Sequence, residues 1–584
     1  MKRSIARSMF PDTPKAPKLV AVLVAFVSLL ASSTSWNPQQ TSASVIAAAA
    51  AGELDQDFGT GGKVTTDFLG FGARAYAVAI QSDGKIVTAG VGVDNSHTSG
   101  FALARFTTGG AFDTTFGIGG RVLTASGGLL AAATSIGLQA DGKIVAAGTA
   151  ADPISFQLDF ALARYNPDGS LDSTFGIGGK VVTDFSSNID ESFALAIQND
   201  GKIVVAGVTT PTGSFNDDFA ISRYNNDGSL DQSFGSGGRI ATDFYGSSDQ
   251  ANGVVIQSDG KIVAVGEVTV IVDNRFFNRA GVARYNSDGS ADATFGTGGQ
   301  VVIGVSGAQF FSRFNGVALQ RDGKIVATGI AFNPTTRVDF GLVRLTANGS
   351  LDSTFGVSGK VTTDFFGIDD VARSVVLQPD GKIIAAGFTT GNPGPVFSQD
   401  FSIARYNRDG SLDTTFGNGG KVATDFFGDD NDGDVCNSLA LQRDGKIVAA
   451  GSASKALGEG SAIIELALAR YNWATFDVCI QDESNGNLLE FNSNTGEYLL
   501  ENCGKDITLT GVGKVTNDPY GCKVILQDTG PVSKRPDRNV NVLVNRCTRA
   551  ATASIQILST GLSFSIADSD ITNNTCRCGE FAAR

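Results

Sequence analysis

A segment that recurs seven times limits the possible folds of this chain more than any other feature of its sequence. Successive copies are 58 to 64 residues apart, measured between seven Asp-Gly-Lys tripeptides that begin at Asp83, Asp141, Asp200, Asp259, Asp322, Asp380 and Asp444. A Phe-Gly-x-Gly-Gly motif also recurs, and it begins at Phe58, Phe116, Phe175, Phe234, Phe295, Phe355 and Phe416. Only the sixth copy departs from the motif, with Ser358 in place of a glycine. Seven copies at a nearly constant period predict a repeat architecture.

Each repeat contains four segments of β-strand type, which we name A, B, C and D in chain order. In the copy around residue 380 they are residues 371–378, 382–388, 401–406 and 421–426. An Asp-Gly turn joins A to B, and Asp-Gly between two β-rich segments is a strong hairpin signal. No segment has a sustained helical apolar period, so we expect no helices. The fold class predicted for residues 54–472 is therefore an all-β, seven-bladed β-propeller.

The phase of the repeat predicts how the ring closes. The chain enters the repeats with a lone D-type strand at residues 63–68, and it leaves them with a C-type strand at residues 466–471 that has no D strand after it. We expect the N-terminal strand to complete the last blade, because an open ring would expose unpaired backbone donors and acceptors.

The repeat resembles the delta-60 repeat family. The resemblance rests on L-D-x-T-F-G-x-G-G-K-V-x-T-D-F at residues 171–185 and on L-Q-x-D-G-K-I-x-A-A-G at residues 377–387, and it covers about residues 54–472. Membership would imply a propeller-like fold in a secreted or surface-associated bacterial protein, and it implies no particular reaction.

The N-terminal residues have the pattern of a targeting segment. Five basic residues precede an apolar run at residues 19–31, and small residues follow it. This pattern predicts a secretory signal peptide over residues 1–35 and a linker over residues 36–53. An uncleaved membrane anchor is the alternative, although the run is short for a membrane span. We therefore expect a secreted or cell-surface protein whose only membrane contact is this segment.

Charge and histidine content restrict the possible partners and chemistry. The net charge of −14 disfavours nucleic acid and anionic membranes as partners. A single histidine, His97, disfavours histidine-based catalysis and multi-histidine metal sites. We expect no cofactor, with calcium as the one open possibility.

Several charged residues recur in nearly every copy. Strand C carries an arginine at Arg105, Arg164, Arg223, Arg284, Arg344, Arg405 and Arg470, and strand D ends in an aspartate at Asp67, Asp184, Asp243, Asp364 and Asp425. We predict an ion pair within each blade between these two sets, with ligand binding by the arginines as the alternative. Asp172 and its equivalents are expected to cap turns, with calcium binding as the alternative.

An acidic run in the seventh repeat is a weak candidate for calcium binding. It contains Asp429, Asp430, Asp432 and Asp434. An EF-hand loop fails, because placing Gly433 at the obligatory glycine position puts Gly428 where the first carboxylate is required. A solvated acidic loop is the main interpretation, and a looser calcium site stays open.

The loops of the repeat fall into two classes. The A–B hairpins and C–D linkers are nearly uniform, whereas the B–C and D–A loops vary in length and chemistry, and each class should emerge at one end of the propeller. The variable end carries an aromatic and basic patch in the loops of blades four and five. Its members are Arg275, Phe276, Phe277, Arg279, Phe310, Phe311, Arg313 and Phe314. Exposed aromatic and arginine side chains favour binding, although some of these phenylalanines could pack beneath their loops.

Residues 473–584 lack the repeat and predict a second, cysteine-rich all-β domain. Short β-rich runs separated by turns suggest a small β-sandwich. Its six cysteines are candidates for up to three disulfides: Cys479, Cys503, Cys522, Cys547, Cys576 and Cys578. Their pairing is open, and zinc binding is a weaker alternative. Cys436 in the seventh repeat is expected to be a buried thiol.

Three functions compete at this point. We expect first a non-enzymatic binding propeller that recognises a protein or a polysaccharide at the cell surface through its variable loops. The second possibility is a structural or adhesion protein anchored by residues 473–584, and the third is a polysaccharide lyase or hydrolase. No singular pair of carboxylates and no Gly-x-Ser-x-Gly motif supports the enzyme.

Overall fold

The structure is a computed structural model in which every regular element is a β-strand. It describes residues 50–68, 72–94, 99–124, 131–151, 157–185, 189–303, 310–391, 398–428, 433–458 and 461–473, and then a set of strands between residues 478 and 572. The predicted signal peptide and all but the end of the predicted linker lie outside these residues. The described residues include no helix that is long and apolar enough to cross a membrane.

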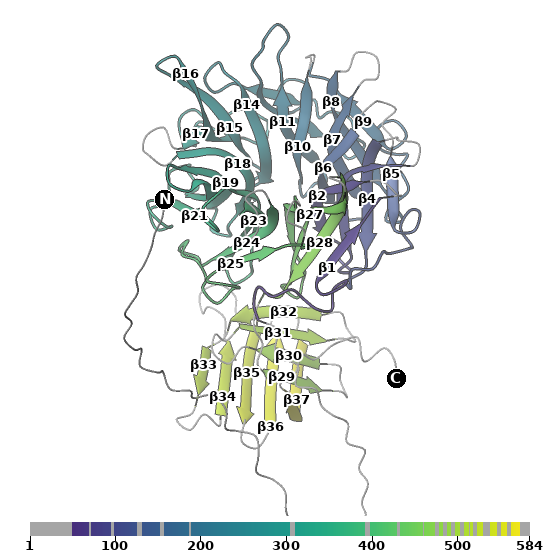
Figure 1. The fold of residues 1–584 in the computed structure, drawn as a ribbon, viewed down its shortest axis with the longest axis vertical. Helices are drawn as coiled ribbons and strands as arrows, with labels where there is room; N and C mark the ends of the chain where they lie inside the picture. Colours follow the sequence, from purple (N-terminus) through teal and green to yellow (C-terminus); the bar gives the residue numbers. More distant parts are fainter. Residues whose placement is uncertain are drawn as a thin grey trace, which may run out of the picture. The chain divides into compact units, whose positions relative to one another are not determined.

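Seven four-stranded antiparallel sheets form the blades of a β-propeller, as predicted (Figure 1). Blade one is β2 (Ala73–Ile80), β3 (Ile86–Val93), β4 (Ser99–Phe106) and β5 (Arg121–Thr124), and blade two is β6 (Ala131–Leu138), β7 (Ile144–Ala151), β8 (Leu158–Tyr165) and β9 (Lys180–Thr183). Blade three is β10 (Asp190–Ile197), β11 (Ile203–Thr209), β12 (Asp218–Tyr224) and β13 (Arg239–Thr242), and blade four is β14 (Asp249–Ile256), β15 (Ile262–Val272), β16 (Arg275–Tyr285) and β17 (Gln300–Ile303). Blade five is β18 (Phe310–Leu319), β19 (Ile325–Asn333), β20 (Arg337–Leu345) and β21 (Lys360–Thr363), and blade six is β22 (Asp370–Leu377), β23 (Ile383–Thr390), β24 (Gln399–Tyr406) and β25 (Lys421–Thr424). Blade seven is β26 (Val435–Leu441), β27 (Ile447–Gly458), β28 (Ser461–Tyr471) and the N-terminal β1 (Lys63–Thr66).

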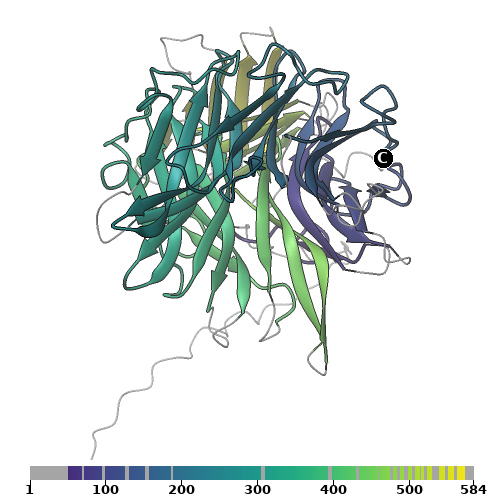
Figure 2. The same ribbon diagram turned by 90° about the horizontal axis from the view of Figure 1, so that it is seen from above.

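The N-terminal strand closes the ring, which confirms the prediction made from the phase of the repeat. Strand β1 pairs with β28 in antiparallel register, with Lys63 opposite Ala469 and Thr66 opposite Leu466. Figure 2 shows the purple N-terminal strands beside the light green strands of blade seven. The last blade therefore has four strands like the other six, and its outer strand comes from the N-terminal end of the propeller.

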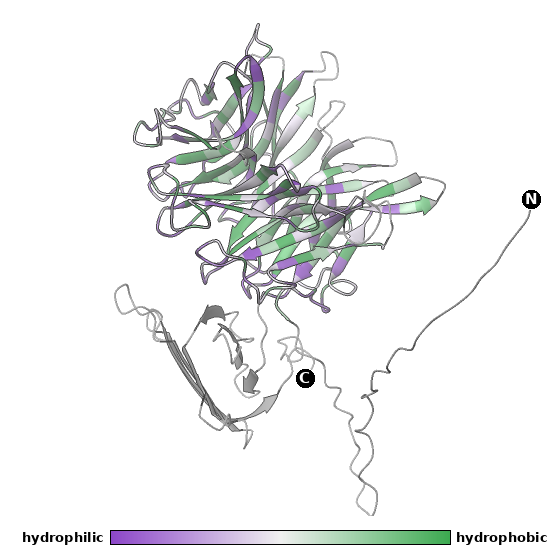
Figure 3. Cartoon of the chain, turned by 60° about the vertical axis from the view of Figure 1, so that its left-hand side comes forward, coloured by the Kyte–Doolittle hydropathy of each residue, from purple (hydrophilic) through white to green (hydrophobic). Residues whose placement is uncertain are grey.

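The A strands form the inner ring of the propeller, because each of them contacts the A strands of both neighbouring blades. Each A strand contains a bulge, for example between Ser192 and Ala194 in blade three. The hydrophobic cores lie between successive blades, where Val87 and Ala89 of blade one pack with Ile144 of blade two. Figure 3 shows that apolar residues are concentrated along the strands and hydrophilic residues in the loops.

The Phe-Gly-x-Gly-Gly motif forms a tight turn before strand D. Phe175 is fully buried, and its carbonyl accepts a hydrogen bond of 2.9 Å from the Gly179 amide. Gly176 has a φ of 52°, and a Cβ at this position would lie 2.2 Å from the carbonyl oxygen of Lys180. The motif is repeated because each blade needs both the buried phenyl ring and this backbone approach.

The strands after residue 477 form one antiparallel sheet of nine, in the order β32-β31-β30-β29-β37-β36-β35-β34-β33. Their bounds are β29 (Val478–Asp482), β30 (Asn487–Phe491), β31 (Glu497–Asn502), β32 (Ile507–Val512), β33 (Lys514–Asn517), β34 (Lys523–Asp528), β35 (Arg538–Asn545), β36 (Ala550–Ile557) and β37 (Leu562–Thr572). The pairing joins all nine strands, so the predicted β-sandwich would require this sheet to fold back on itself, and the sandwich stays a prediction. Cys479 lies in β29, and the other five candidate disulfide cysteines lie outside the described residues. Cys436 is a free and fully buried thiol, as expected.

Candidate functional site

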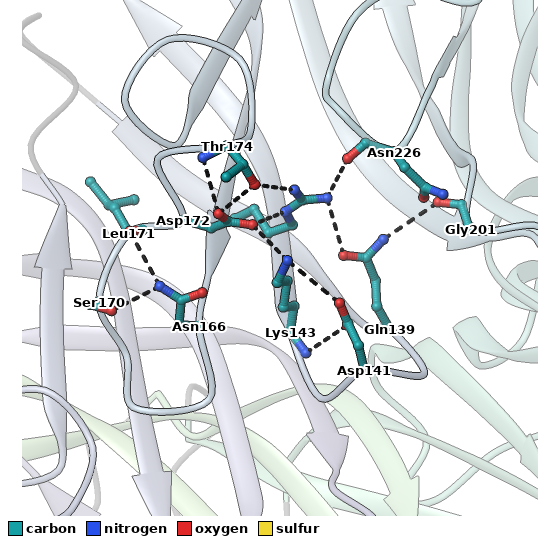
Figure 4. A network of polar contacts seen from close by, with 11 residues as sticks. Gln139, Asp141, Lys143, Asn166, Ser170, Leu171, Asp172, Thr174, Gly201 and Asn226 are labelled. Carbon is teal, nitrogen blue, oxygen red and sulfur yellow. Dashed lines mark hydrogen bonds and ion pairs between the residues drawn. The ribbon is translucent and has the colours of Figure 1, made fainter.

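The uniform end of the propeller carries a polar network that links each blade to the next. In blade two, Arg164 in β8 donates from Nε to Oδ2 of Asp172 over 2.7 Å, and Lys143 Nζ lies 3.1 Å from the same oxygen (Figure 4). Nη1 of Arg164 also donates to the backbone carbonyl of Asn226 in the linker of blade three. One guanidinium therefore joins a turn of its own blade to the neighbouring blade.

This network closes around the whole ring. The Nε–Oδ2 distance is 2.7 or 2.8 Å in all seven pairs: Arg105–Asp113, Arg164–Asp172, Arg223–Asp231, Arg284–Asp292, Arg344–Asp352, Arg405–Asp413 and Arg470–Asp55. Each guanidinium also lies over a phenylalanine of the Phe-Gly-x-Gly-Gly motif, at 4.6 Å for Arg164 over Phe175. In the seventh pair, Asp55 precedes β1 and Arg470 lies in β28, so the ion pair joins the two ends of the propeller.

The predicted pairing of these arginines with the aspartates at the end of strand D is wrong. Strands C and D are antiparallel, with Ala163 opposite Lys180 and Phe160 opposite Thr183. Arg164 and Asp184 therefore lie at opposite ends of the strand pair. The partner is instead the linker aspartate, which also caps its own turn as expected, since Asp172 Oδ1 accepts from the Thr174 amide at 3.0 Å.

The buried pairs at this end are structural. The arginines and their partners are no more than 6% exposed. Burial raises the pKa of Asp413, but Arg405 and the Thr415 hydroxyl outweigh burial and lower this pKa to about 2. Each carboxylate stays ionised and binds a buried guanidinium, so these seven arginines are occupied by contacts within the protein and are not placed to bind a shared ligand.

The variable end is different in every blade, and blade four carries a long B–C hairpin. Strands β15 and β16 pair without a break as far as Val272 opposite Arg275. Asp273 and Asn274 form the turn with φ values of 49° and 60°, a conformation typical of a two-residue hairpin. Residues that we expected in a loop are therefore held on a regular two-stranded extension.

The structure separates the predicted patch residues by depth. Arg275 and Phe276 are exposed at the hairpin tip, with Phe276 71% exposed, whereas Phe277 is half-buried. Arg279 is buried, and Phe314 is fully buried in the core between blades four and five. Phe310 and Phe311 lie in β18 opposite Phe332 and Ala331, and their side chains are outside the described set. The tip of the hairpin is thus the accessible part of the patch.

A second site, which sequence reasoning missed, lies where the inner strands of blades six, seven and one begin. A cavity of about 290 Å³ is lined by Arg74, Tyr76, Arg373 and Asn437, among others. Arg373 Nη1 donates to Asn437 Oδ1 at 2.5 Å, and its guanidinium lies 5.3 Å from the ring of Phe388. Burial lowers the pKa of Arg373 first, and the nearby charges of Arg313 and Arg74 lower it further.

Arg74 and Arg373 line this cavity and make it a place for negative charge, and Arg313 is close enough to lower the pKa of Arg373. Within the described part of the chain, none of Arg74, Arg313 and Arg373 forms an ion pair with a carboxylate. Arg74 is exposed, and Arg373 is half-buried. Guanidinium groups recognise carboxylate, sulfate and phosphate oxygens through paired hydrogen bonds. The signal in the sequence is the bulge residue of strand A, which is Arg373 in one copy and uncharged in the other six (Tyr76, Thr134, Phe193, Asn252, Asn315 and Asn437).

The predicted acidic loop is only partly within the described residues. Asp429, Asp430 and Asp432 lie outside them. Asp434 is fully buried, and its Oδ2 accepts a hydrogen bond of 2.8 Å from the Phe426 amide.

Comparison with known sequences supports a β-propeller repeat family. Six segments match the profile of a family described as a domain of unknown function (DUF5122) β-propeller: residues 81–116, 139–175, 198–234, 257–295, 320–355 and 378–416. Each segment begins at or just before an A–B hairpin and ends in the Phe-Gly-x-Gly-Gly motif. The delta-60 name stays a prediction. No curated protein sequence matches the chain.

Solved structures with low similarity include two enzymes and the propeller domain of a protease. A catalytically inactive virginiamycin B lyase from Staphylococcus aureus with quinupristin is 11% identical, with a TM-score of 0.38 over 69% of this chain and 98% of that one. The β-propeller domain of the Trilobed protease from Pyrococcus furiosus is 11% identical, with a TM-score of 0.36 over 67% and 97%. An α-L-arabinofuranosidase from Fusarium graminearum is 8% identical, with a TM-score of 0.35 over 58% and 93%. At these scores the likenesses carry no argument about activity.

Proposed function

We propose, for a chain built from the repeats of a β-propeller family, that this is an exported, non-enzymatic binding protein whose variable end recognises an anionic partner. The observation that carries the proposal is the meeting of Arg74 and Arg373 at one cavity of an otherwise acidic chain, with the charge of Arg313 near Arg373. Neighbouring guanidinium groups repel one another, and an anionic ligand would relieve this repulsion. Export rests on the N-terminal targeting pattern.

An acidic polysaccharide is the partner class that fits the cavity best. The guanidinium groups can bind carboxylate or sulfate, the Asn437 side chain can bind hydroxyl groups, and the Tyr76 ring offers an aromatic face for a sugar. An acidic protein segment would use the same arginines, and the ligand panel below distinguishes the two.

The hairpin of blade four supplies a second, apolar contact surface on the same end. Besides Phe276, it exposes Ile271 by 49% and Val272 by 42%. Apolar and arginine side chains on a regular hairpin are a favourable arrangement for contact with a larger partner. Arg74 and Arg373 supply the charge recognition, and the hairpin extends the contact.

The test compares binding of the full chain to acidic polysaccharides (polygalacturonate, alginate), neutral dextran and acidic peptides. The test variant is Arg74→Gln/Arg373→Gln, and the control is Arg443→Gln, which removes an exposed arginine at the uniform end. We expect binding of the acidic polysaccharides alone, with at least a tenfold loss of affinity in the double variant and none in the control.

Unchanged binding by the double variant would contradict the proposal. A loss in Phe276→Ser alone would place recognition on the hairpin instead of the axis. Preference for the acidic peptides would replace the polysaccharide by a protein partner.

A further inference from the structure

Three aspartates from two neighbouring blades meet at four of the seven blade junctions, on the variable end. One comes from strand C, one follows strand D, and one lies at the start of strand A of the next blade. The four clusters are Asp159, Asp184 and Asp190; Asp218, Asp243 and Asp249; Asp339, Asp364 and Asp370; and Asp400, Asp425 and Asp434. In each cluster, one carboxylate oxygen from every member lies within 4.8 Å of the other two.

The clusters are partly buried and two of them have no basic partner. The strand A member is fully buried in all four clusters. Within the described residues, no lysine or arginine forms an ion pair with any carboxylate of the second or third cluster. This contrasts with the seven linker aspartates at the other end of the propeller, each of which has an arginine and a lysine beside it.

Hydrogen bonds to the protein use only some of the carboxylate oxygens. Asp249 Oδ2 accepts from the Phe244 amide at 2.7 Å, and Asp243 Oδ1 accepts from the Gly246 amide at 2.6 Å. In the third cluster, Asp339 is 1% exposed, and its Oδ1 is buried without a hydrogen-bond partner. A buried carboxylate oxygen that lacks a protein donor, in a group of three carboxylates, is a position that a cation can satisfy.

The three carboxylates of each cluster repel one another, because their oxygens lie within 4.8 Å and one member is fully buried. A bound cation would compensate these charges.

Comparison of the repeats shows that the other three junctions all lack the buried aspartate of strand A, although the closing junction keeps Asp67 and Glu465 at the other two positions. The same positions hold Gly100, Ala125 and Ala131 at the junction of blades one and two, and Arg279, Gly304 and Ser312 at that of blades four and five. At the closing junction, Glu465 has Lys455 at 4.0 Å, and Ala73 replaces the buried aspartate. A junction that lacks the buried carboxylate thus lacks the complete set, and one of them carries a guanidinium instead.

We propose that the four three-aspartate clusters are calcium sites that clamp adjacent blades together. Calcium takes six to eight oxygen ligands at about 2.3–2.6 Å, so oxygens of one coordination sphere lie within about 5 Å of each other, as they do here. Three carboxylates supply the charge, and backbone carbonyls and water can complete the sphere. Magnesium fits less well, because it demands a tighter octahedron and keeps most of its water.

The test is isothermal titration calorimetry of calcium chloride into the full, chelator-treated chain. The main variant replaces the strand D member of each cluster: Asp184→Asn, Asp243→Asn, Asp364→Asn and Asp425→Asn. These positions are exposed or half-buried, and an asparagine oxygen can still accept the turn hydrogen bond, so the fold is retained. Asp273→Asn, at the exposed tip of the blade four hairpin, is the matched control.

We expect about four calcium ions per chain, one for each cluster, at least a tenfold weaker affinity in the fourfold variant, and no change in the control. The single variant Asp243→Asn should lower the stoichiometry by one, and it keeps the test valid if the fourfold variant does not fold. Absence of calcium binding, binding retained by the fourfold variant, or equal affinity for magnesium would overturn the proposal.

Discussion

Replacement of Asp55 by asparagine should lower the free energy of unfolding strongly, although the two side chains have nearly the same shape. Asp55 is 4% exposed, and its Oδ2 lies 2.7 Å from Arg470 Nε and 3.0 Å from Lys446 Nζ. Burial raises the pKa of Asp55, but these two cations outweigh burial and lower it. Asparagine keeps the shape and one acceptor but removes the negative charge.

The expected cost follows from the buried cation that the substitution leaves behind. Arg470 is 6% exposed and keeps its charge, and removal of one partner of a buried ion pair costs about 3–5 kcal/mol. Asp83→Asn is the matched control, because Asp83 is half-exposed and lies 3.3 Å from Lys85. Exposed pairs of this kind contribute about 0–1 kcal/mol. Asp172→Asn is the equivalent change in blade two, and it should lower the free energy of unfolding by about as much as Asp55→Asn.

Equilibrium unfolding in urea measures both variants. Trp473 follows β28, is 3% exposed, and its carbonyl accepts from Arg405, so its fluorescence reports on the closing blade, while circular dichroism reports on all strands. We expect Asp55→Asn to lower the free energy of unfolding by about 3 kcal/mol or more, against less than about 1 kcal/mol for Asp83→Asn. Equal midpoints for the two variants would refute the view that the ion-pair ring closes the fold.

Two further predictions concern pH and backbone strain. In calcium-free buffer, Asp249 and Asp370 have folded pKa values of about 7 against 3.8 unfolded, so the folded state binds more protons between these values. Their contribution to stability is complete below about pH 4 and is lost as pH rises through 7, so a higher urea midpoint at pH 8 than at pH 5 would contradict this prediction. Ser358 has a φ of 53° at a position where the other copies have glycine, so Ser358→Gly should stabilise the chain by about 0.5–1 kcal/mol. Gly178→Ala, at the equivalent position of blade two, should destabilise the chain by about 1 kcal/mol through backbone strain alone, because no atom lies within 4 Å of the new Cβ. Opposite signs in thermal unfolding would show that the left-handed conformation does not decide the effect.

The propeller was predictable because its signals are local and repeated. An Asp-Gly turn fixes each A–B hairpin, and the lone strand at residues 63–68 fixes the closure. The partner of Arg164 was not predictable in the same way, since it depends on which end of the C–D strand pair each residue occupies. The hairpin of blade four could have been recognised from the Asp273-Asn274 turn between alternating β-rich segments.

The sites at the variable end depend on contacts between blades, which the repeat alone does not reveal. Asp218 and Asp249 belong to different blades and are adjacent only through the packing of β12, β13 and β14. Arg74 and Arg373 are far apart in the chain and meet because both lie on the inner ring. Comparison of the copies at the bulge of strand A would have shown Arg373 to be singular, but not that Arg74 and Arg313 lie beside it.

One end of the propeller is proposed to recognise a partner, while the other end holds the blades together. Hydrogen–deuterium exchange of the full chain, with and without a bound acidic polysaccharide, distinguishes the two ends. We expect added protection at the starts of the A strands around Arg74 and Arg373 and on the β15–β16 hairpin, with none at the A–B hairpins. Protection centred on the A–B hairpins and C–D linkers, where the arginine–aspartate pairs lie, would contradict it.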